Sequence, residues 1–156
     1  MQILTVLSPE DQITIGGIPD EAIAGLIGMP VNNPGDLARR EGFSLGEFRP
    51  NPAFSAFMQQ VIRTFGPDDL ELQEAARQQG DGSVGVIDLR TPEGPMGRVP
   101  VEDIIGIFAV EGGKLGSYHA NDKHLVFSAN GLVQLPPSLR EVHIRELKRL
   151  GVSQGQ

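Results

Sequence analysis

Residues 103–120, "DIIGIFAVEGGKLGSYHA", decide the fold class because they combine a buried strand with a tight turn. The run "DIIGIFAV" is apolar on both faces, which is typical of a strand in the middle of a sheet. It leads into Gly112 and Gly113, a pair that suits a two-residue hairpin loop. In that register Glu111 and Lys114 face each other as a favourable pair of opposite charge. The stretch therefore predicts two antiparallel strands.

The flanking residues extend this hairpin. The segment "SVGVIDLR", residues 83–90, alternates with the period of two that is expected of a strand. A second tight-turn signal, Asn130–Gly131, lies within "HLVFSANGLVQL". We therefore predict that residues 83–135 form one antiparallel sheet with turns at Gly112–Gly113 and Asn130–Gly131.

Helical patterns precede this sheet. Asn51 is a good N-cap and Pro52 a good first helical residue. Apolar side chains then recur at i, i+3, i+4 and i+7 as far as Phe65, which predicts a helix with one apolar face. A second and more polar helix is expected over residues 67–79.

A last helix is expected to begin near Ser138, whose spacing to Glu141 fits a capping box, and to end before Gly151. Strands and helices segregate along the chain, which favours an α+β fold: an antiparallel sheet built from hairpins and packed against two or three helices. Residues 51–151 would form this core. Residues 1–50 are interpreted as an irregular arm of the same domain, with a β-hairpin formed by "ILTVL" and "QITI".

Composition limits the function classes. The chain has 156 residues, the size of one domain, with 13 Lys and Arg against 20 Asp and Glu, a net charge of -7. Such an acidic surface disfavours nucleic acid as a partner. No cysteine is present, so a thiol nucleophile and a Cys-ligated metal are excluded. The N-terminus lacks a signal-peptide pattern, and no run approaches the ~18 apolar residues of a membrane span, so we expect a soluble, cytoplasmic protein.

Two histidines provide the first candidate site. If the chain turns at residues 120–123, His119 and His124 lie opposite each other with Cβ atoms about 5 Å apart. They could then share a divalent metal ion, with Asp122 as a third ligand, or contact another ligand together with Tyr118. The alternative is that both are exposed turn residues without a role. In either case, replacing both histidines with alanine should leave stability almost unchanged.

Two further groups of polar residues are candidates. His143 and Glu146 lie within the apolar arc of the last helix, as an acid–base pair or as an imidazole satisfied by a carboxylate. Asp88 and Arg90 share one strand face, and Arg98 follows in a loop rich in proline. Arg90 and Arg98 are candidates for binding a carboxylate or phosphate, unless Asp88 only neutralises one of them.

No phosphate-binding loop, nucleophile elbow or His-Glu-x-x-His motif occurs in the chain. We therefore predict a non-enzymatic interaction or ligand-binding domain without a cofactor. The alternative is a small hydrolase or isomerase that uses the histidine pair, with or without a divalent metal. The expected partner is another protein or a second copy of the chain, bound through residues 1–50 or an open strand edge.

Overall fold

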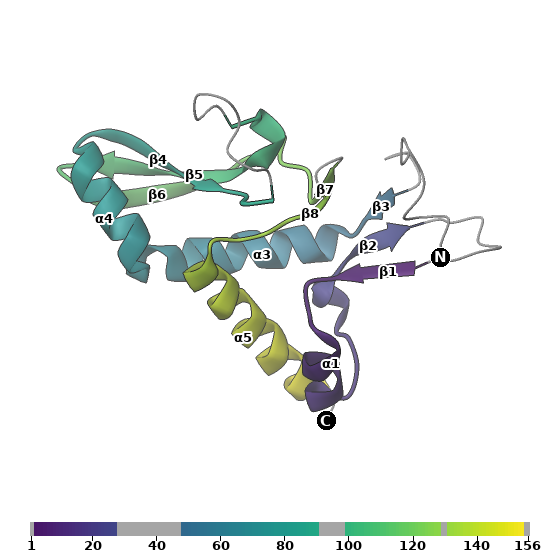
Figure 1. Cartoon of the computed structure of the whole chain (residues 1–156). Coiled ribbons are helices and arrows are strands. Elements are labelled where there is room, and N and C mark those ends of the chain that lie inside the picture. Colours follow the sequence, from purple (N-terminus) through teal and green to yellow (C-terminus); the bar gives the residue numbers. More distant parts are fainter. Residues whose placement is uncertain (1, 28–47, 91–98, 129–130, 155–156) are drawn as a thin grey trace.

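The computed structural model describes residues 2–27, 48–90, 99–128 and 131–154. Within these ranges, three antiparallel sheets and four α-helices form an α+β fold, as predicted (Figure 1). The long helix α3 (Pro52–Phe65) extends from one three-stranded sheet to the other, and α5 (Pro137–Gln154) runs from the region of α3 towards α1 (Pro9–Ile15). No described helix has the length and apolarity needed to cross a membrane.

One of the two three-stranded sheets contains the strands predicted from residues 103–120. Its order is β4 (Gly82–Ile87), β5 (Ile104–Glu111) and β6 (Lys114–Ala120), all antiparallel, so β5 is the central strand as predicted. Gly112 and Gly113 form the predicted turn, with φ angles of 58° and 75° that favour glycine.

The prediction of a single sheet over residues 83–135 is wrong. After β6 the chain turns away, because the side-chain amide of Asn121 donates to the carbonyls of Val101 and Ile104, 2.9 and 2.7 Å away. A separate small sheet pairs β7 (Phe127–Ser128) with β8 (Gly131–Leu132). Gly131 pairs with Ser128 within this ladder instead of lying in a turn, and Asn130 lies outside the described residues.

The N-terminal segment differs from the predicted hairpin. β1 (Gln2–Thr5) pairs with β2 (Ile23–Ile27), which pairs with β3 (Phe48–Pro50), and "QITI" belongs to helix α1. The cause is a capping box: Ser8 Oγ accepts the Asp11 N–H at 3.1 Å, and the Asp11 carboxylate accepts the Ser8 N–H at 3.4 Å. A short 3₁₀ turn, Asp20–Ala22, precedes β2.

The predicted helix over residues 51–65 is confirmed, with Asn51 Oδ1 accepting the Ala53 N–H at 3.2 Å. Helix α4 (Leu70–Gln79) begins later than expected, because Asp69 is its N-cap and the 3₁₀ turn Gly66–Asp68 precedes it.

Helix α5 begins near Ser138, as predicted, but the predicted cap and the predicted end are wrong. Ser138 lies inside the helix, and its hydroxyl donates to the carboxylate of Asp69 on another element. Gly151 does not end the helix, which continues to Gln154. A Cβ at Gly151 would lie 2.8 Å from Ile15 Cδ1, so this glycine allows α5 to pack closely on α1.

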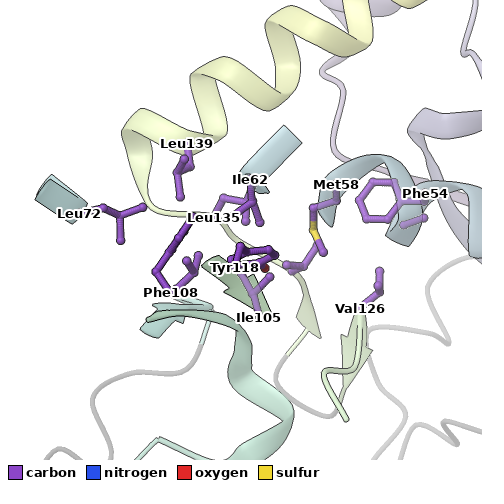
Figure 2. Close-up of a cluster of buried hydrophobic side chains, with 13 residues drawn as sticks. Phe54, Met58, Ile62, Leu72, Ile105, Phe108, Tyr118, Val126, Leu135 and Leu139 are labelled. Carbon is purple, nitrogen blue, oxygen red and sulfur yellow. The ribbon is translucent and has the colours of Figure 1, made fainter. Parts of the chain in front are cut away.

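The core lies between α3, the sheet formed by β4, β5 and β6, and the start of α5 (Figure 2). Phe54, Met58 and Ile62 of α3 belong to this core together with Ile105 and Phe108 of β5. A second cluster joins Leu7 and Ala22 to Leu147 of α5. The described part of residues 1–50 is therefore packed against the rest of the chain.

Candidate functional site

A buried ion cluster lies directly after β4. Arg90 Nε is 2.9 Å from Asp103 Oδ1 and 3.3 Å from Asp88 Oδ2, and none of these three side chains has exposed surface. Asp88 does not lie on a strand face with Arg90, since β4 ends at Ile87. Instead, Asp88 Oδ1 accepts the backbone N–H of Arg90 at 3.1 Å and closes a local turn.

The guanidinium of Arg90 has no donor left for a ligand. Its Nη1 donates to the carbonyls of Val126 and Gly131 at 3.1 and 2.9 Å. Its Nη2 donates to the carbonyls of Glu102 and Leu125. With the Nε bond to Asp103, all five N–H groups of the arginine are used. Arg90 therefore joins three chain segments. Of the two predicted roles for Arg90, neutralisation by Asp88 fits this geometry better than binding of a ligand.

The two histidines of the first candidate site do not face each other. His119 is opposite Ile107 in the ladder between β5 and β6 and is exposed, whereas β6 ends at Ala120 and His124 lies outside any strand. His124 Nε2 is 3.0 Å from Asp88 Oδ2, and its side chain is only 3% exposed. The predicted cross-strand pair of His119 and His124 is therefore wrong, because the side chain of His124 points into the ion cluster.

For the same reason, the structure does not show the arrangement of His119, His124 and Asp122 on which the predicted metal site depends. Among the described residues, which include His119, His124 and Asp122, no three His, Asp or Glu side chains come together as a metal site would require.

The other predicted contacts with a ligand are also separated. Tyr118 is buried in the core, where its hydroxyl donates to the side chain of Gln59 and Arg63 lies 5.6 Å from its ring centroid. Burial raises the pKa of Tyr118. Arg98 lies outside the described residues.

A small cavity of about 320 Å³ lies between α3 and the turn after β6. Ser55 and His124 both line it, together with Asp122. No hydrogen bond joins Ser55 to His124, although both residues are within the described ranges, so a hydroxyl nucleophile with its base is not assembled there.

His143 on α5 is a buried polar residue in apolar surroundings. It is 2% exposed, and its Nε2 has no hydrogen-bond partner. The rings of Phe54 and Phe57 pack against the imidazole, with centroids 5.6 and 6.3 Å away. The predicted pairing with Glu146 is not formed, because that carboxylate contacts Arg145 and Arg149 instead. Burial lowers the pKa of His143 to about 4, so the imidazole is neutral at pH 7.

His143 lines a cavity of about 330 Å³, which we call the His143 cavity. Three segments line it: the end of β1, residues 131–135, and the face of α5 that carries His143. Its lining residues are Thr5, Val6, Gly131, Leu132, Val133, Gln134, Leu135, Arg140, His143 and Ile144. The lining thus combines apolar side chains with a few polar ones, as small-molecule sites do.

The sequence contains one sign of this site, an imidazole within the apolar arc of a helix. The other lining segments could not be found from sequence, because β1 and residues 131–135 meet α5 only in the folded chain. Arg140 and Gln134 were therefore missed as candidates.

No protein-family model, no curated protein and no solved structure matches this chain.

Proposed function

We propose that this protein is a non-enzymatic ligand-binding domain and that the His143 cavity holds its ligand. The observation that carries the proposal is that His143, a buried imidazole whose Nε2 has no hydrogen-bond partner, is one of the residues that line the cavity. A buried polar atom without a partner costs about 1–3 kcal/mol. A ligand that forms a hydrogen bond with this atom would recover that free energy, which favours occupation of the cavity.

The size and composition of the cavity support binding of a small molecule. Its volume of about 330 Å³ lies at the lower end of ligand sites, which span about 300–1,000 Å³. The lining combines polar and apolar groups, which suits a ligand that carries both.

Binding fits this site better than catalysis. The described lining residues include no Asp, Glu or Lys that could act as a partner for His143. The hydroxyl of Thr5 is already used, since it donates to the Ala22 carbonyl at 2.7 Å and accepts the Leu7 N–H at 3.2 Å. The imidazole therefore has neither an orienting carboxylate nor a free nucleophile beside it.

The proposal is tested by screening a library of neutral and charged small molecules for an increase in melting temperature. A ligand stabilises the state that binds it, so we expect at least one compound to raise the melting temperature of the parent protein. The same compound should have no effect on His143→Leu, which removes the polar nitrogen. His119→Leu is the matched control, because that imidazole is exposed on β6. A library without any hit, or hits that His143→Leu retains, would contradict the proposal.

A further inference from the structure

The His143 cavity carries a positive charge. Arg140 is the only charged residue among the described lining residues, and they include no carboxylate. The guanidinium of Arg140 is exposed and has no hydrogen bond or ion pair with any residue in the described ranges. In a chain with a net charge of -7, this is a local site for an anion.

The charge of the site matches a single carboxylate. A planar guanidinium can bind a carboxylate through two parallel hydrogen bonds. A phosphate group carries about -1.5 to -2 charges at pH 7, which one arginine leaves unbalanced.

The rest of the cavity requires an apolar body. Val6, Leu132 and Ile144 line it from the three segments that form its lining. A carboxylate bound at Arg140 could therefore bury an aliphatic chain against these side chains. His143 also lines the cavity, so its imidazole is available for one additional polar contact. A hydroxyl group suits this contact in either tautomer of the imidazole, because a hydroxyl both donates and accepts.

We infer that the ligand is a small aliphatic hydroxy monocarboxylic acid, with its carboxylate on Arg140 and its hydroxyl on the imidazole of His143. This inference rests on the proposed function and adds the chemical class of the ligand.

The test uses α-hydroxy and β-hydroxy monocarboxylic acids with short aliphatic chains, each paired with its primary amide, and inorganic phosphate. Calorimetric titration measures their affinity for the parent protein, Arg140→Gln and Arg149→Gln. Arg149 is a matched control because it lies on the same helix and pairs with Glu146 outside the cavity. At least one acid should bind, and its amide should bind at least about tenfold more weakly, as expected for the loss of a charge-assisted hydrogen bond. Arg140→Gln should weaken the acid equally, and Arg149→Gln should not.

Three results would overturn this inference. They are an amide that binds as tightly as its acid, an unchanged affinity in Arg140→Gln, or phosphate binding more tightly than every acid. If neutral compounds bind and depend on His143 while no acid does, the inference fails and the proposed function stands. If neither the acids nor the neutral library bind, both fail.

Discussion

The Nε of Arg90 lies 2.9 Å from Oδ1 of Asp103, and both side chains are completely buried. Asp88 contacts the same nitrogen at 3.3 Å, so one guanidinium faces two carboxylates without access to water. The arginine also donates to the carbonyl of Val126, directly before β7, and to the carbonyl of Gly131 in β8. The cluster thus fixes the irregular segments that follow β4 and β6.

We predict that Arg90→Met lowers the free energy of unfolding by about 3–5 kcal/mol, because it leaves buried carboxylates without their counter-charge. Chemical denaturation measures this change. Arg77→Met is the control, since Arg77 is exposed on α4 and pairs with Glu74 on the surface. The control should be nearly neutral, and similar losses in the two variants would contradict a special role for Arg90.

The two histidines should differ in their contribution to stability. We predict that His124→Ala lowers the free energy of unfolding by about 1–3 kcal/mol, because it removes a buried hydrogen bond to the Asp88 carboxylate. His119→Ala should change it by no more than about 0.5 kcal/mol, because His119 is exposed. Thermal and chemical denaturation of both single variants test this difference. Two equally small effects would restore the expectation from sequence, in which neither histidine matters for stability.

Gly106 in β5 allows the ring of Tyr118 to lie against the strand. A Cβ at this position would be 2.1 Å from the Tyr118 Oη and 2.4 Å from its Cζ. We predict that Gly106→Ala destabilises the protein by about 1–3 kcal/mol through overpacking, as measured by chemical denaturation. Gly85→Ala on β4 is the matched control, because its Cβ would approach only the flexible end of Ile87, at 3.0 Å. A Gly106→Ala variant as stable as Gly85→Ala would show that the ring relocates without cost.

Local signals explain which elements could be predicted from sequence. The helix after Asn51 and the hairpin at Gly112–Gly113 depend on caps, periodicity and turn residues that are adjacent in the chain. Residues 8–11, "SPED", which lie between "ILTVL" and "QITI", are ambiguous, because serine followed by proline starts a helix as readily as it forms a turn. The partner of β1 is β2, beyond a helix, and no local pattern indicates that pairing.

The candidate sites depended on contacts that are distant in sequence. Arg90 binds residues up to 41 positions away, mostly through backbone carbonyls. Every residue type has such a carbonyl, so these contacts cannot be recognised from the sequence. The His143 cavity likewise requires the position of α5 relative to β1. Self-association through residues 1–50 or an open strand edge stays a prediction.

The buried imidazole of His143 should make stability depend on pH. Its pKa falls from 6.5 in the unfolded chain to about 4 in the folded protein, because burial disfavours the charged form. Between these values the unfolded state binds a proton that the native state does not. The free energy of unfolding should therefore fall as the pH is lowered from about 6.5 to about 4, by up to about 1.4 kcal/mol per pH unit.

The variant His143→Gln lacks this titration, so we predict a flatter dependence of its free energy of unfolding on pH across the same window. Chemical denaturation at several pH values compares the two slopes. Asp11 does not confuse the comparison: its hydrogen bond with Lys148 lowers its pKa, so its contribution is lost only as the pH falls below about 3.8. Equal slopes for the parent and the variant would show that the imidazole takes up its proton in the folded state as readily as in the unfolded state. That result would contradict the prediction, which depends on the burial of an Nε2 without a partner.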